Sequence, residues 1–149
     1  MRFVMAVQRT AEVTWENDLL NGRGKVRFGS GAIPEASVSW AARTEKPDGK
    51  TSPEELLAGA HASCYSMALS GTLARNRTPP KRLDVKATAT FDKVGDAWKV
   101  TTMELAVKAE VPGIDAGRFV ELATVAKDTC PISQALKNNV EIKLSAQLV

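Results

Sequence analysis

Hydrophobic and polar residues alternate with a period of two in the segment that follows Pro79-Pro80. The apolar positions of this alternation are Leu83, Val85, Ala87, Ala89 and Phe91. After turn-forming residues at Asp92–Asp96, a similar alternation continues through Trp98–Val111. Because successive side chains of a strand point to opposite faces, the pattern predicts a long antiparallel hairpin with one face in water.

The preceding segment has the features of a long helix. Ser52 suits the N-cap, Pro53 suits the first helical position and Glu55 can complete a capping box, so we predict a helix that runs to about Arg75. Residues 56–74 contain no charged side chain and many small ones. A helix that is apolar on every side must be surrounded on every side, so we expect it to be central, enclosed by sheet or by a partner subunit.

The remaining elements are shorter. Strand-like runs are predicted at Glu12–Glu16, Lys25–Phe28, Ser37–Ala42 and Val140–Leu148, and a short helix at Cys130-Pro131. A second helix is predicted from Asp115 to Asp128, with an apolar stripe at Phe119, Leu122, Val125 and Ala126. The expected fold is therefore α+β, a single domain over residues 1–149 with antiparallel sheets around a buried helix.

Composition narrows the functional classes. The 149 residues carry a net charge of only +3, which is too small and too dispersed to indicate nucleic-acid binding. The N-terminal apolar run is too short for a signal peptide, and the serines and the histidine within residues 56–74 argue against a membrane span. The sequence contains no glycine-rich nucleotide motif. We expect a cytoplasmic protein.

Candidate chemistry centres on two cysteines and one histidine. Cys64 lies in the apolar helix, where burial would raise the pKa of its thiol unless a cation is brought close. Cys130 precedes Pro131 and is expected to be the N-cap of the short helix, facing free N–H groups that favour a thiolate. His61 shares a helical face with Cys64, which leaves a three-ligand metal site open, although a core histidine bonded to neighbouring backbone is the simpler interpretation.

Two long motifs contain these cysteines and resemble a known family. The first is Thr51-Ser-Pro-Glu-Glu-Leu-Leu-Ala-Gly-Ala-His-Ala-Ser-Cys-Tyr-Ser-Met-Ala-Leu, and the second is Ala126-Lys-Asp-Thr-Cys-Pro-Ile-Ser-Gln-Ala-Leu. Both are similar to the OsmC family, which includes osmotically inducible protein C and organic hydroperoxide resistance proteins. The segment Val111-Pro-Gly-Ile-Asp-Ala is closer to the OsmC branch, and the Gly-Arg-Gly turn at residues 22–24 also matches.

This resemblance implies an intertwined homodimer that reduces organic hydroperoxides, and more weakly hydrogen peroxide, without a cofactor. It implies that Cys64 is the peroxidatic cysteine and Cys130 the resolving one, with a dihydrolipoyl group or another small thiol as reductant. The family's active-site arginine corresponds to Arg43, with Arg23 as the alternative, and the glutamate that holds it corresponds to Glu54. A non-enzymatic stress-response binding module and a Cys/His metal-binding protein remain the rival interpretations.

Overall fold

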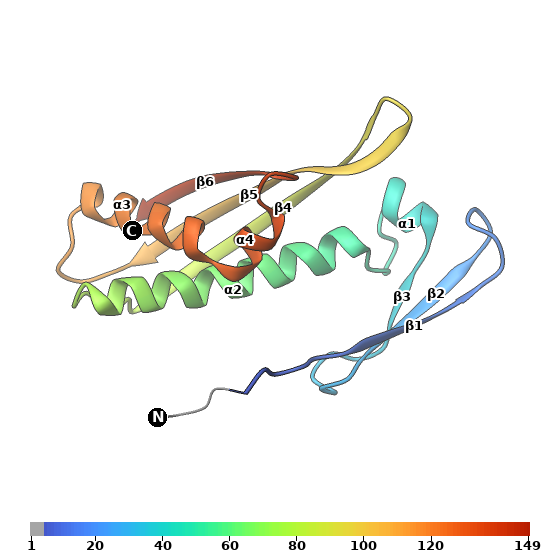
Figure 1. Cartoon of the computed structure of the whole chain (residues 1–149), viewed down its shortest axis with the longest axis horizontal. Helices are drawn as coiled ribbons and strands as arrows, with labels where there is room; N and C mark the ends of the chain where they lie inside the picture. The colour runs from blue at the N-terminus through green and yellow to red at the C-terminus, as the bar shows by residue number, and fades with distance from the viewer. Residues whose placement is uncertain (1–4) are drawn as a thin grey trace. The chain divides into compact units, whose positions relative to one another are not determined.

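The structure, a computed structural model, describes residues 5–149. Its elements follow in the order β1 (Ala11–Glu16), β2 (Arg23–Phe28), β3 (Ala36–Val38), α1 (Trp40–Thr44), α2 (Pro53–Arg75), β4 (Arg82–Val94), β5 (Ala97–Glu110), α3 (Ala116–Thr129), α4 (Pro131–Leu136) and β6 (Glu141–Leu148) (Figure 1). They form two compact units, of which the first ends at Pro53 and the second begins at Glu54. The expectation of one domain stays a prediction.

The first unit contains an antiparallel sheet in the order β1-β2-β3. β1 and β2 contain the predicted strand-like runs Glu12–Glu16 and Lys25–Phe28, and they begin one and two residues earlier. The prediction of a strand over Ser37–Ala42 is wrong at its C-terminal end, because the chain leaves β3 and forms α1. The reason is local: Ser39 is an N-cap whose Oγ accepts a hydrogen bond from the Ala42 N–H at 3.1 Å.

Two glycines on either side of Arg23 allow close packing within this sheet. A Cβ on Gly24 would lie 2.6 Å from Cγ2 of Val38, and one on Gly22 would lie 2.6 Å from Cζ2 of Trp15. Neither position therefore has room for a side chain, and the packing of the Trp15 indole fixes the backbone on both sides of Arg23.

Helix α2 has the predicted bounds and is the central helix of the fold. One face is covered by its own chain, and its buried side chains are Glu54, His61, Tyr65, Leu69, Thr72 and Leu73. The opposite face is exposed along Glu55, Gly59, Ser63 and Met67, and the Met67 side chain is 75% exposed. In the described part of the chain, no helix combines the length and the apolar character that a membrane crossing requires.

The second sheet has the order β4-β5-β6. β4 and β5 form the predicted antiparallel hairpin, but β4 extends to Val94, because a two-residue loop beginning at Gly95 (φ +63°) closes it more tightly than the predicted turn. β6 pairs with β5 in parallel, a departure from the antiparallel pattern. The crossover through α3 and α4 makes this direction possible.

The main core lies between α2, α3 and one face of this sheet. The fully buried β5 residues Met103, Leu105, Val107 and Ala109 occupy the predicted face. On α3 the buried stripe is Phe119, Leu122, Ala123 and Ala126, and Val125 is 47% exposed, so the predicted place of Val125 is wrong. Ala123 is buried there instead, and its carbonyl accepts a hydrogen bond from the Tyr65 hydroxyl of α2 at 3.1 Å. Cys130 belongs to this core.

Candidate active site

The two cysteines come from different helices and are neighbours in space. Cys64 lies in the middle of α2 and is half-buried, whereas Cys130 directly precedes α4 and is completely buried. Both are free thiols, and a hydrogen bond between their side chains raises the pKa of Cys64. The structure thus brings together the two sulfur atoms that the sequence singled out.

Opposing effects act on the Cys64 thiol. Burial raises its pKa most strongly, because a thiolate loses hydration inside the protein. A hydrogen bond from the Ile132 backbone N–H to the sulfur lowers the pKa, while the hydrogen bond and the charge of Cys130 raise it. Cys64 therefore has one donor from α4, and further positive charge would be needed to offset its burial.

The start of α4 differs from the sequence interpretation in one respect. Pro131 is the first helical residue and Cys130 is the N-cap, as predicted, but the Cys130 side chain makes no capping hydrogen bond. The N–H of Ile132 is instead donated to Cys64. The sequence predicts that the free N–H groups of α4 face Cys130, whereas the acceptor of the Ile132 N–H is Cys64. A motif identifies the start of a helix but not the distant side chain that lies against it.

His61 lies on the buried face of α2, one turn before Cys64. Its Nε2 is 2.7 Å from Oγ of Ser133 in α4, so the expectation of a neighbouring backbone partner is wrong. Its Nδ1 is buried and has no hydrogen-bond partner among the described residues, and burial lowers the pKa of His61. Sequence reasoning missed Ser133; its spacing of three residues from Cys130 was the available signal.

Residues 5–149 hold no group of three or more His, Cys, Asp or Glu side chains that could bind a metal ion. His61, Cys64 and Cys130 therefore do not form the three-ligand cluster that the metal-binding interpretation requires.

The charged candidates come from both units: Arg23 and Arg43 belong to the first, and Glu54 is the first residue of the second. Arg43, in α1, is half-buried, and its Cζ is 5.9 Å from the centroid of a Trp40 ring. Arg23 is exposed, and its Nε donates to Oε2 of Glu16 at 3.2 Å. Glu54 is buried in the first turn of α2. The assignment of either arginine to Cys64 stays a prediction.

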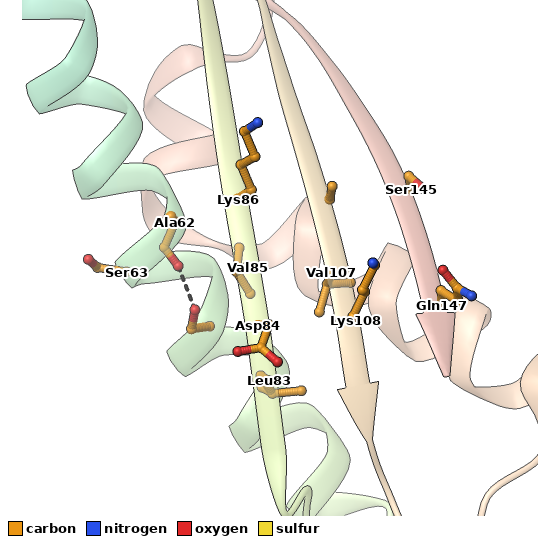
Figure 2. Close-up of a pocket in the computed structure, with 12 residues that line it drawn as sticks. Ala62, Ser63, Leu83, Asp84, Val85, Lys86, Val107, Lys108, Ser145 and Gln147 are labelled. Carbon is orange, nitrogen blue, oxygen red and sulfur yellow. Dashed lines mark hydrogen bonds between the residues drawn. The ribbon is translucent and has the colours of Figure 1, made fainter. Parts of the chain in front are cut away.

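A cavity of about 630 Å³ lies between α2 and the strands of the second sheet (Figure 2). Ala62, Ser63 and Ser66 of α2 line one side of it, and the Ser66 hydroxyl donates to the Ala62 carbonyl at 2.6 Å. Cys64 and Cys130 are not among its lining residues, so this cavity and the sulfur pair are separate features.

Comparison with protein families gives an assignment. The family profile described as "OsmC-like protein" matches residues 46–145, a range that includes both cysteine motifs. The chain belongs to the OsmC-like family. This membership agrees with the resemblance of the motifs and with the arrangement of a central helix and sheets.

Individual OsmC-like proteins support the same conclusion. The chain is 38% identical to Peroxiredoxin OsmC of Escherichia coli over 97% of its length and 99% of the relative's. It is 28% identical to Organic hydroperoxide resistance protein-like 1 of Staphylococcus epidermidis over 70% and 76% of the two lengths. These identities support the OsmC branch. The fold matches organic hydroperoxide resistance protein OhrB of Bacillus subtilis with a TM-score of 0.71 at 23% identity, covering 93% of this chain and 98% of the other.

Proposed function

We propose that this protein is a cysteine-based peroxidase that reduces organic hydroperoxides, and more weakly hydrogen peroxide, to alcohols or water. The observation that carries the proposal is the contact between the Cys64 and Cys130 thiols at the start of α4. The names of the relatives, a peroxiredoxin and an organic hydroperoxide resistance protein, agree with this chemistry.

In the first step the Cys64 thiolate attacks the terminal oxygen of the peroxide. A sulfur–oxygen bond forms and the O–O bond breaks, so that the sulfur is oxidised to a sulfenic acid and the alkoxide leaves and takes up a proton. The Ile132 N–H favours the thiolate, and Arg43, or Arg23 in its place, supplies the positive charge that burial makes necessary. Glu54 holds that arginine.

In the second step the Cys130 thiol attacks the sulfenic acid. A Cys64–Cys130 disulfide forms and water leaves, because the oxygen of the sulfenic acid takes up the thiol proton. An external dithiol, a dihydrolipoyl group or another small thiol, then reduces this disulfide by exchange and is itself oxidised. The cycle is complete with thiols alone and requires no metal, haem or flavin.

The active form is a homodimer in the cytoplasm. The exposed face of α2 along Gly59, Ser63 and Met67, together with the adjoining cavity, supports the homodimer. A second copy that packs there would complete the enclosure that an apolar helix requires.

Mass spectrometry under non-reducing conditions tests the cycle directly. One equivalent of cumene hydroperoxide is expected to convert both thiols of the wild type into one disulfide within the chain. Cys64→Ser should abolish peroxide consumption, and Cys130→Ser should consume peroxide once and then over-oxidise. An unchanged thiol count in the wild type would favour the non-enzymatic binding module.

The arginine assignment needs a matched pair of variants. Arg43→Ala is expected to slow the oxidation of Cys64, and Arg23→Ala should leave it at the wild-type rate. The reverse result would transfer the role to Arg23.

A further inference from the structure

One buried polar pair lies directly beside the sulfur pair and has no role in the cycle described so far. His61 is three residues before Cys64 on α2, and Ser133 is three residues after Cys130 in α4. Residues three apart on a helix are neighbours on one face, so the His61–Ser133 hydrogen bond joins the same two helices one turn from the sulfur contact. The two contacts are adjacent cross-links between α2 and α4.

This pair is shielded from water. His61 has no exposed surface and Ser133 is 3% exposed, and their 2.7 Å separation is that of a short hydrogen bond. Where water cannot compete, such a bond restricts the relative position of the elements that it joins.

The pair is a poor choice for stability alone. Nδ1 of His61 is buried and has no hydrogen-bond partner within residues 5–149, and burial disfavours the charged imidazole. An unsatisfied buried polar group costs free energy that an apolar side chain of similar size would not cost. A role other than packing accounts for the presence of a histidine here.

Helix α4 depends on such an anchor. It has only six residues, which is too short to be stable without tertiary contacts. On its exposed side the Gln134 amide donates to the Asp128 carbonyl, and on its buried side Ser133 bonds to His61.

We propose that His61 and Ser133 are positioning residues whose hydrogen bond holds α4 against α2, so that Cys130 and the Ile132 N–H remain at the Cys64 sulfur. This inference rests on the proposed peroxidase cycle. It identifies the contact that favours the second step of that cycle, formation of the Cys64–Cys130 disulfide. After oxidation, the Cys64 sulfenic acid either reacts with the Cys130 thiol, releasing water, or with a second hydroperoxide, giving a sulfinic acid and an alcohol. A correctly held α4 favours the disulfide.

Four variants test the proposal. Ser133→Ala removes the hydroxyl, and the double variant His61→Leu/Ser133→Ala removes both polar groups, which is often close to neutral for stability. His61→Gln places an amide nitrogen near the position of Nε2 and is the conservative replacement. Thr124→Ala, at an exposed threonine of α3 whose hydroxyl donates to the Val120 carbonyl at 2.9 Å, is the matched control.

The readout is the ratio of sulfinic acid at Cys64 to Cys64–Cys130 disulfide after a fixed excess of cumene hydroperoxide. Loss of one ordinary buried hydrogen bond corresponds to about a fivefold change in an equilibrium, so Ser133→Ala and the double variant are expected to raise the ratio about fivefold. His61→Gln and Thr124→Ala should remain near the wild type. A double variant that melts like the wild type and gives the wild-type ratio would overturn the proposal.

A second oxidant separates this inference from the peroxidase cycle. Diamide joins neighbouring thiols without any peroxide: one thiol adds to its N=N bond and the second displaces that adduct, forming the disulfide and the hydrazine. If the wild type does not react with cumene hydroperoxide, the proposed function is wrong. Slower formation of the Cys64–Cys130 disulfide by diamide in Ser133→Ala than in the wild type would still support the positioning role. Equal closure rates in all variants would refute it.

Discussion

Oxidation of the sulfur pair is predicted to stabilise the folded chain. Because the two thiols are already in contact, a disulfide should form with only a small movement of α4. The closed loop from Cys64 to Cys130 contains about 67 residues, for which the chain-entropy relation gives about 4 kcal/mol. For a chain of this length that corresponds to a rise in melting temperature of roughly 10 °C.

The assay compares thermal unfolding of the fully reduced protein and the stoichiometrically oxidised protein at one protein concentration. The control is Cys130→Ser treated in the same way, in which no loop can close and no rise is expected. Non-reducing mass spectrometry confirms that the bridge is within one chain.

Strain in the Cys64–Cys130 disulfide would reduce or cancel the expected rise in melting temperature. Sulfur atoms in hydrogen-bonding contact must move closer to reach the bond length of about 2.05 Å, and a rigid α4 would convert that movement into strain. If the bridged protein melts at or below the temperature of the reduced protein, the native positions of the two sulfurs are not suited to a disulfide, and the resolving role of Cys130 loses its structural basis.

Three further predictions follow from individual contacts. Cys130→Ala should lower the pKa of Cys64, because the hydrogen bond and charge of Cys130 raise it, and the pH profile of Cys64 alkylation should move to lower pH. Tyr65→Phe removes a buried hydroxyl that donates to the Ala123 carbonyl at 3.1 Å, so urea unfolding should show a loss of about 1 kcal/mol with an unchanged peroxide rate. Burial lowers the pKa of His61, so the unfolded state binds the proton more readily than the folded state. The free energy of unfolding should therefore fall as the pH drops below about 6.5. His61→Gln should flatten this dependence between about pH 5 and 6.5, and an unchanged slope in the variant would contradict the prediction.

Local patterns predicted much of the fold. Pro53 at a helix start and the strict alternation from Leu83 to Phe91 identify α2 and β4, because both signals depend on the chain's immediate neighbours. Both cysteines were identified as candidates in the same way, from a helix interior and a Cys-Pro helix start.

The wrong predictions concern features that depend on contacts between residues far apart in the sequence. Val125 fits an amphipathic stripe as well as Ala123 does, but Ala123 is the buried residue, at the point where the Tyr65 hydroxyl of α2 donates to its carbonyl. The parallel direction of β6 depends on the crossover through α3 and α4, and the partner of His61 is a serine 72 positions away. Periodicity contains no information on which element packs against which.

The position of Ile132 has a further consequence during synthesis, because the ribosome makes Cys64 well before Cys130 and Ile132. A ribosome adding 5–20 residues per second needs about 3–13 seconds to proceed from Cys64 to Cys130, and during that interval the first sulfur has no resolving partner. The N–H that favours its ionised form is contributed two residues after Cys130, on the same short helix. The donor that activates Cys64 and the thiol that protects it from over-oxidation therefore reach it together, when α4 packs against α2. Until then the nascent chain carries an ordinary, slowly reacting thiol at Cys64.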